Sequence, residues 1–156
     1  MAREHRYQLT ITWTGNRGTG TSGYRAYGRD HEISAEGKSA TLQGSSDLAF
    51  QGDPSRYNPE ELLVASLSAC HMLWFLHLCS DAGIVVTSYR DSATGEMAQH
   101  ADGAGEFTKV TLRPRVTIID SSRAADTTAL HTKAHHLCYI ARSVNFPVEH
   151  EPTVET

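Results

Sequence analysis

The sequence predicts a single α+β domain over residues 1–156. Residues 62–79 form a long apolar run, but two serines, two histidines and two cysteines interrupt it, so a buried helix fits better than a membrane span. Segments with alternating apolar residues lie on both sides of this run. A second helical pattern precedes the last strand segment. Strands, a buried helix, a hairpin, a helix and a final strand are together typical of an α+β fold.

Composition excludes several classes of protein. A hydrophobic content of 39% and a charged content of 21% are typical of a globular chain rather than a disordered one. The net charge of −4 and the absence of a cluster of Lys and Arg argue against a nucleic-acid partner. The N-terminal MAREHRYQLT lacks an apolar signal core, so we expect a cytoplasmic protein that is not attached to a membrane.

The strands are expected where β-branched and aromatic residues alternate with polar ones. Gly28 and Gly37 join two short strands, and the tight turn HADGAG joins two long strands into a hairpin. Pro114 predicts an edge position or a bulge in the second of these. The expected strand segments are 6–14, two short strands within 24–46, 84–98, 107–120 and 146–154.

The first helix has a well-specified start. Asn58 is a good N-cap, Pro59 suits the first helical position, and Glu61 completes a capping box. The helix is expected to run to about Asp81, where Gly83 ends it. The second helix is expected over 121–143, capped by Ser121 or Ser122, with an apolar stripe along it.

The chain contains three cysteines, and an odd number without a secretion signal argues against a structural disulfide framework. Cys70 is either a small core residue or a reactive thiol, and the second role needs a lowered pKa and access to solvent. Cys79 falls on the opposite face of the helix from Cys70, so we expect it in the core. Cys138 lies on the second helix, where it either packs or reacts.

A metal site is a weaker alternative. His131, His135 and Cys138 share one helix face through spacings of three and four, and Cys70 could supply a fourth ligand. No CxxC or HExxH motif supports this arrangement, and nine histidines make chance neighbours common. We therefore expect no metal.

Two segments resemble one family. The segment NPEELLVASLSACHMLWFLHLCSDAGI resembles the buried helix of the OsmC/Ohr family of thiol peroxidases (osmotically inducible protein C and organic hydroperoxide resistance proteins), in which the reactive cysteine follows a glutamate by ten residues, as Cys70 follows Glu60. The segment AHHLCYIARSVNFPVEHEPTV resembles the second cysteine helix and the final strand of that family. The GRD at 28–30 resembles the strand region where Ohr members keep an arginine, so the likeness runs from Gly28 to Val154.

The resemblance implies roles for four residues. Cys70 would be the peroxidatic thiolate and Cys138 the resolving thiol, while Glu60 and Arg29 would form the polar pair beside Cys70. The cycle would pass through a sulfenic acid and a disulfide. The substrate would be a small organic hydroperoxide, and an external dithiol or a lipoyl group would be the reductant. No bound cofactor is required.

Some positions depart from the family pattern. Phe50 stands where members nearer to OsmC keep their arginine, so Arg56 and Arg25 are alternatives to Arg29. His71 replaces an aromatic residue, and Tyr139 follows Cys138 without the usual proline. These departures bear on substrate preference.

The resemblance also implies antiparallel sheets around a long buried central helix in an intertwined homodimer. Two other functions stay open on this sequence. One is a redox-sensing or ligand-binding protein of the same fold without efficient turnover, and the other is the His/Cys metal protein described above.

Overall fold

Helix α1 (Pro59–Asp81) begins and ends where its capping residues predict. The Asn58 side chain accepts a hydrogen bond from the backbone amide of Glu61 at 2.8 Å, and the Glu61 carboxylate accepts one from the amide of Asn58 at 3.1 Å. This reciprocal pair is the predicted capping box. Gly83 follows the helix with a φ of 68°, a left-handed conformation that favours glycine.

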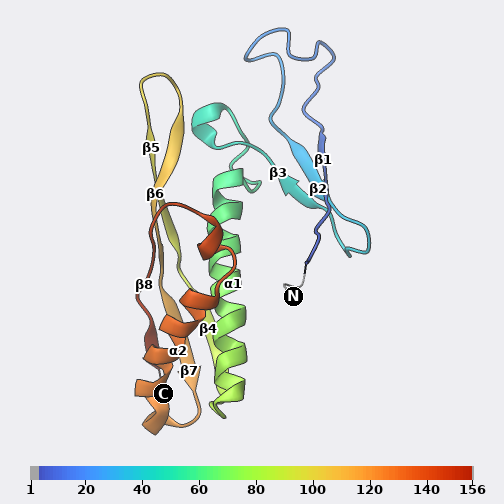
Figure 1. Cartoon of the computed structure of the whole chain (residues 1–156). Coiled ribbons are helices and arrows are strands. Elements are labelled where there is room, and N and C mark those ends of the chain that lie inside the picture. Colours follow the sequence, from blue (N-terminus) through green and yellow to red (C-terminus); the bar gives the residue numbers. More distant parts are fainter. Residues whose placement is uncertain (1–3, 156) are drawn as a thin grey trace. The chain divides into compact units, whose positions relative to one another are not determined.

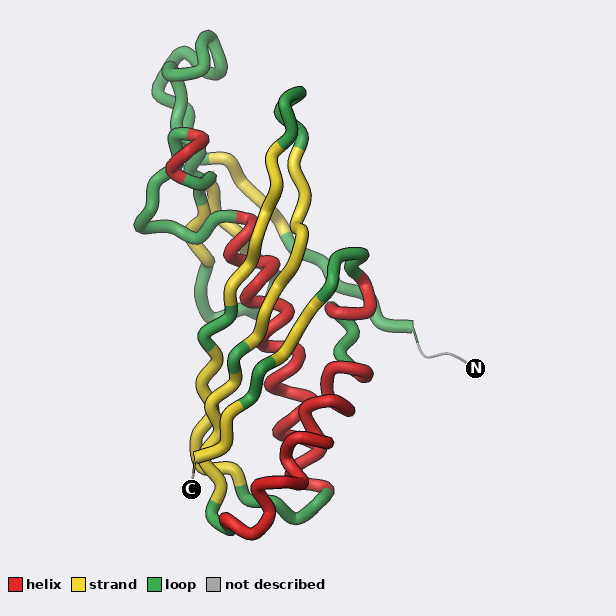
Figure 2. Tube along the Cα trace, turned by 90° about the vertical axis from the view of Figure 1, so that its left-hand side faces the viewer, coloured by secondary structure: helices red, strands yellow, loops and turns green. Residues whose placement is uncertain are grey.

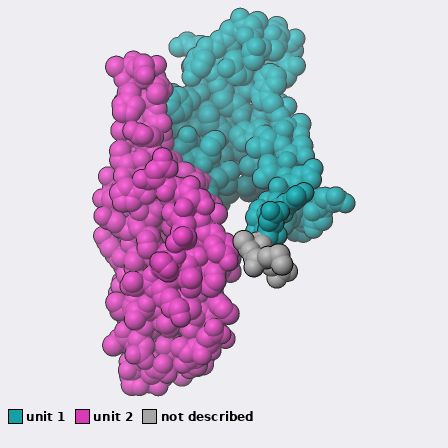
Figure 3. Space-filling view, in the orientation of Figure 1, with its two compact units in different colours: residues 1–62 teal, residues 63–156 magenta. Residues whose placement is uncertain are grey.

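The computed structural model describes residues 4–155 and confirms the α+β fold class (Figure 1). The chain divides into two compact units, residues 1–62 and 63–156, which Figure 3 colours separately. The division falls within the first turn of α1. The prediction of a single domain over 1–156 stays a prediction.

The first unit contains a small antiparallel sheet in the order β1-β2-β3. Its strands are β1 (Thr10–Trp13), β2 (His31–Ser34) and β3 (Leu42–Gly44), and a short 3-10 helix, η1 (Leu48–Phe50), follows them. Ile11 pairs with Ile33, which pairs with Leu42. All of β1 is exposed, including Ile11 at 60%, so the first unit leaves apolar strand residues in solvent.

The second unit contains two three-stranded sheets in the orders β4-β7-β9 and β5-β6-β8. The predicted hairpin is present, but each of its long strands is broken in two. The final strand is also divided, and its two parts pair in parallel with β7 and β6. The strands are β4 (Val86–Asp91), β5 (Thr94–Gln99), β6 (Gly105–Leu112), β7 (Pro114–Ile118), β8 (Val148–His150) and β9 (Thr153–Glu155).

The Asp91 carboxylate connects the break between β4 and β5 to the break between β6 and β7. Asp91 accepts a hydrogen bond from the backbone amide of Arg113 at 2.6 Å and another from the Ser68 hydroxyl at 2.5 Å. Arg113 is the residue between β6 and β7, and Ser68 lies on α1. Asp91 therefore fixes the bend of the hairpin against the helix, and Pro114 begins the strand after the bend, as its missing amide hydrogen allows.

The second long helix, α2 (Ala124–Leu137), is shorter than predicted. A 3-10 turn, η2 (Ser121–Arg123), precedes it, and Asp120 rather than a serine caps that turn. A second 3-10 turn, η3 (Ala141–Ser143), follows it. Cys138 is therefore the C-cap residue of α2 and lies outside the helix, which corrects the expected range of 121–143.

Two apolar clusters hold the second unit together, and Figure 2 shows both helices on one side of its strands. The first cluster packs Phe75 and Leu78 of α1 against β7 and Ala134 of α2. The second packs Leu67 of α1 against Val110 and Leu112 of β6. Helix α1 is long and apolar enough to cross a membrane by length and composition, but a core helix satisfies the same criterion, and α1 contributes to both clusters.

Candidate functional site

The thiols of Cys70 and Cys138 are neighbours within the second unit. Cys70 lies in the middle of α1 and is half-buried, whereas Cys138 is buried with only 1% of its surface exposed. The Cys70 thiol is near enough to raise the pKa of Cys138. Both thiols are free. Residues 68 positions apart in sequence thus come together, as a two-thiol cycle requires.

Burial keeps Cys138 protonated at neutral pH. Desolvation, aided by the nearby Cys70 thiol, raises the pKa of its thiol to about 11, although the backbone amide of Ala141 opposes this by donating a hydrogen bond to Sγ at 3.4 Å. Cys138 is therefore a weak nucleophile while it stays buried. It could attack a partner only with help from a base or after gaining access to water.

Cys79 has the structural role that the sequence predicts. Its side chain is buried in the cluster around Phe75 and Leu78, and burial raises the pKa of its thiol to about 11. Its position in this cluster and its protonation make it unreactive.

Arg29 and Glu60, the predicted polar pair, belong to the first unit. The Arg29 guanidinium donates hydrogen bonds to the carbonyl oxygens of Tyr27 at 2.6 Å and Tyr24 at 2.8 Å. It also lies over both tyrosine rings, at 4.1 Å and 4.4 Å from their centroids. In the described part of the chain, no ion pair joins Arg29 to a carboxylate, Glu60 included. Their placement beside Cys70 remains a prediction.

Arg56 and Arg25, the alternative arginines, differ in their surroundings. The Arg56 side chain lies 3.5 Å from Asp53 and 3.9 Å from Asp30, and it donates a hydrogen bond to Gln43 at 2.7 Å. These carboxylates offset its charge. Arg25 is exposed.

A cluster of four histidines lies in the second unit. His71, the residue after Cys70, has its Nε2 3.0 Å from Nδ1 of His131 on α2, and both side chains are fully buried. The ring centroid of His150, on β8, lies 5.5 Å from that of His71 and 5.2 Å from that of His135. The sequence predicted that His131, His135 and Cys138 share a face of α2, but it did not predict that His71 and His150 complete the cluster.

His71 and His131 are neutral at physiological pH. Desolvation, with a smaller contribution from neighbouring histidines, lowers the pKa of His71 to about 4 and that of His131 to about 3. The pKa of His150 is lowered for the same two reasons. Among the residues described, no group of three or more His, Cys, Asp or Glu side chains has the geometry of a metal site.

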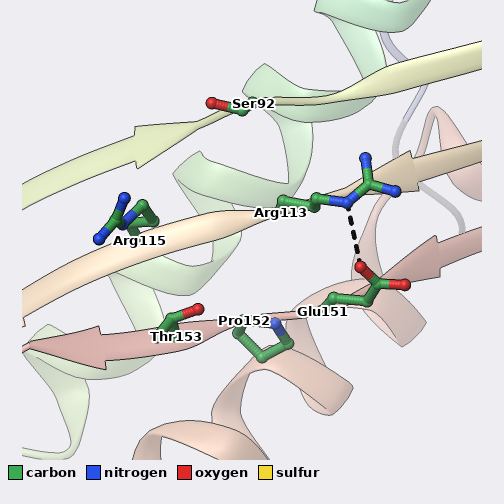
Figure 4. A pocket seen from close by; sticks show the side chains of 6 residues that line it. All are labelled: Ser92, Arg113, Arg115, Glu151, Pro152 and Thr153. Carbon is green, nitrogen blue, oxygen red and sulfur yellow. Dashed lines mark hydrogen bonds and ion pairs between the residues drawn. The ribbon is translucent and has the colours of Figure 1, made fainter.

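A separate pocket of about 560 Å³ opens on the outer surface where β6 gives way to β7 (Figure 4). Arg113 and Arg115 line it, but Arg113 is paired with Glu151 at 3.0 Å and Arg115 with Glu155 at 2.5 Å. No cysteine lines this pocket. It is therefore not the thiol site.

Comparison with known proteins decides the family. The model of the family described as OsmC-like protein matches residues 52–153, which include both α1 and the segment with Cys138. The chain belongs to the OsmC-like family. No curated protein matches the chain.

Solved structures agree with this membership. The OsmC-like protein is similar to an OsmC-like protein of unknown function from Vibrio cholerae, with 29% identity and a TM-score of 0.85 over 96% of this chain and 100% of the other. An organic hydroperoxide resistance protein from Elizabethkingia anophelis is 20% identical with a TM-score of 0.66 over 99% of each chain. Another from Legionella pneumophila is 16% identical with a TM-score of 0.64 over 98% of this chain and 100% of the other. At these lower identities the last two show the fold.

Proposed function

We propose that this OsmC-like protein is a thiol peroxidase that reduces organic hydroperoxides with Cys70 and Cys138. The proximity of these two thiols, through which Cys70 raises the pKa of Cys138, is the observation that carries the proposal. Family members described as organic hydroperoxide resistance proteins share its fold and support it. Cys70 is half-buried, so a peroxide can reach its thiol, whereas the buried thiol of Cys138 is protected from direct reaction with the peroxide.

The cycle has three balanced steps. The Cys70 thiolate attacks the distal oxygen of the hydroperoxide, the O–O bond breaks, and the alkoxide takes a proton and leaves as the alcohol, so that Cys70 becomes a sulfenic acid. The Cys138 sulfur attacks the Cys70 sulfur, the S–O bond breaks, and water leaves as the disulfide forms. An external dithiol, such as a dihydrolipoyl group, then reduces the disulfide by two exchange steps. No resident cofactor takes part.

Arg29 is the best candidate for the cation beside Cys70. Its side chain is held in place by the two tyrosines, and no carboxylate in the described part of the chain pairs with it, whereas Asp30 and Asp53 already offset the charge of Arg56. An uncompensated guanidinium stabilises a thiolate more strongly and can orient a peroxide. Glu60 would fix the guanidinium once the site is assembled.

A homodimer is the proposed assembly. Ala65, Ala69 and Leu73 form an exposed apolar stripe on α1, with Leu73 62% exposed. The first unit likewise exposes alternating Leu9, Ile11 and Trp13 along β1. A second copy that covers these surfaces would make α1 the buried central helix that the family resemblance implies. We propose that this dimer acts in the cytoplasm, without nucleic acid or membrane as a partner.

The test is dithiol-dependent loss of cumene hydroperoxide and tert-butyl hydroperoxide, measured with dihydrolipoamide and with dithiothreitol. We expect turnover in the parent protein and faster reduction of these substrates than of hydrogen peroxide. Loss of neither substrate with either dithiol would refute the peroxidase. Arg29→Ala and Arg56→Ala, compared side by side, identify the arginine, because only the one beside the thiolate should change the pH at which Cys70 reacts.

One observation favours a second function, a redox sensor of the same fold. The raised pKa of Cys138 slows closure of the disulfide. A single oxidation that forms the Cys70–Cys138 disulfide, without repeated turnover in excess dithiol, would support the sensor over the enzyme.

A further inference from the structure

The His71–His131 pair joins α1, which carries Cys70, to α2, which Cys138 directly follows. His71 is the residue after Cys70 on α1, and His131 lies on α2 seven residues before Cys138. The 3.0 Å contact between Nε2 and Nδ1 is a hydrogen bond between two fully buried rings. It is the one side-chain hydrogen bond between α1 and α2 among the residues described.

The pair can keep this hydrogen bond only while at least one of its rings is neutral. One nitrogen of the bond must donate and the other must accept, so each ring has a defined tautomer. The outer nitrogens, Nδ1 of His71 and Nε2 of His131, are buried without a partner. A second proton on the pair would turn both inner nitrogens into donors, and even one proton would add a charge to a buried site with no anion to receive it.

Among residues 4–155, only histidines act electrostatically on the pKa of His71 and His131. The titratable neighbours on α2 and β8 are His135 and His150, both of which disfavour a positive charge on the pair. From α1, the ring of Phe75 covers His131 at 3.8 Å, and behind it lies Tyr89 of β4 with an unpartnered hydroxyl. The thiols of Cys70 and Cys138 complete the ionisable groups of this region. Protonation would therefore require the helices to part, so that water reaches the rings.

We propose that His71 and His131 are positioning residues: their neutral pair holds the end of α2 on α1 where Cys138 meets Cys70, and protonation of the pair separates the two helices and the two thiols. The separation itself follows from the histidine geometry alone. Its consequence for the enzyme, that disulfide closure fails in acid because the thiols no longer touch, rests on the proposed peroxidase.

The first test follows the native protein without any peroxide. Two-dimensional NMR of the imidazole rings should show that His71 and His131 stay neutral well below pH 6.5, the ordinary histidine pKa, and take up protons only near pH 4 or below. Over the same range, 4,4′-dithiodipyridine labelling of Cys138, located by peptide mass and normalised to a free-thiol peptide at each pH, should rise at least about tenfold. Titration of either ring near pH 6.5, or Cys138 labelling that stays unchanged while the rings become protonated, would overturn the proposal.

The second test uses a pair that cannot take up a proton. In the double variant His71→Gln, His131→Asn, the side-chain amides occupy about the positions of Nε2 and Nδ1, so they can keep a hydrogen bond at every pH. We expect Cys138 labelling in this variant to lose its acid-induced rise. The matched control is His77→Gln on the exposed face of α1, which should behave like the parent. Acid-induced labelling that persists in the double variant would overturn the proposal, and a variant that does not fold leaves the decision to the native titration.

The two proposals fail in different ways. A protein without peroxidase activity would still show the histidine titration and the labelling of Cys138. An active peroxidase whose histidines titrate normally would retain its function and lose only the positioning role.

Discussion

The backbone amide of Ala141 donates a hydrogen bond to Sγ of Cys138 across 3.4 Å. This contact exists because α2 ends at Leu137 and the chain then turns into η3, which brings the amide of residue 141 back over the thiol. An amide donor favours the ionised sulfur and so opposes the effect of burial. In the proposed cycle, the turn after α2 would thus favour ionisation of Cys138 before it attacks the Cys70 sulfur.

Cys138→Ser should stop the proposed cycle after one oxidation. Without the second thiol, a sulfenic acid on Cys70 has no partner within the subunit, so it should accumulate. The measurement is mass spectrometry after treatment with one equivalent of cumene hydroperoxide and trapping with dimedone. One dimedone adduct per subunit on Cys70 is expected, and an adduct on Cys79 or none at all would contradict the assigned roles.

Cys70→Ser should abolish peroxide turnover, whereas Cys79→Ser should leave it unchanged. The two residues lie on the same helix, but only Cys79 is fully enclosed in the core. Its replacement should therefore lower the free energy of unfolding by about 1 kcal/mol through burial of a hydroxyl, with no change in rate. Turnover assays and urea unfolding of both variants check this. Equal turnover in Cys70→Ser and the parent would remove Cys70 from the mechanism.

Asn58→Ala should destabilise the protein by about 1 kcal/mol. The substitution removes the acceptor for the Glu61 amide and so half of the capping box that begins α1. Urea unfolding followed by circular dichroism measures the change. Ser80→Ala, at an exposed position near the other end of α1, is the control and should change stability by less than about 0.5 kcal/mol. Equal stability of Asn58→Ala and the parent would show that the cap contributes nothing to the native state.

The stability of the protein should fall as the pH is lowered from 6.5 to 4.5. Buried histidines with a pKa of about 4 and 3 stay neutral in the folded state, while the unfolded chain takes up protons near 6.5, so acid favours unfolding. This contribution to stability is complete above pH 6.5 and shrinks as the pH falls, by roughly 2 to 3 kcal/mol for each of His71 and His131 at pH 4.5. Urea unfolding at several pH values tests this. The double variant His71→Gln, His131→Asn should have a smaller slope, and a slope equal to that of the parent would refute the assignment.

Much of the fold could be predicted because local signals marked it. Asn58, Glu61 and Gly83 fixed both ends of α1, since caps depend on neighbouring residues alone. The breaks in the hairpin were missed because the strand-like composition of 84–98 and 107–120 continues through them. The bend depends on Asp91, whose partners Ser68 and Arg113 are more than 20 residues away in sequence.

The predicted end of α2 was wrong because the apolar pattern of the helix continues beyond Leu137. Ala141 and Val144 continue the apolar period of the helix, but they pack on the cluster around Leu67 and Val110 from a 3-10 turn. The spacing of apolar residues indicates which residues are buried, but it cannot distinguish a continued α-helix from a separate 3-10 turn.

The pairing of Cys70 with Cys138 was implied by the family resemblance and stays a prediction, supported by the effect of the nearby Cys70 thiol on the pKa of Cys138. The histidine pair beside them was not predicted. Its partners are 60 residues apart, and isolated histidines carry no sequence signal of burial.

The parallel pairing of β8 and β9 has a consequence for the edges of both sheets. These two short strands occupy edges of β6 and β7 that would otherwise be unpaired. Loss of residues 148–155 would leave two hydrogen-bonding edges that can recruit another copy. Removal of so few residues should therefore convert the protein into an aggregating one.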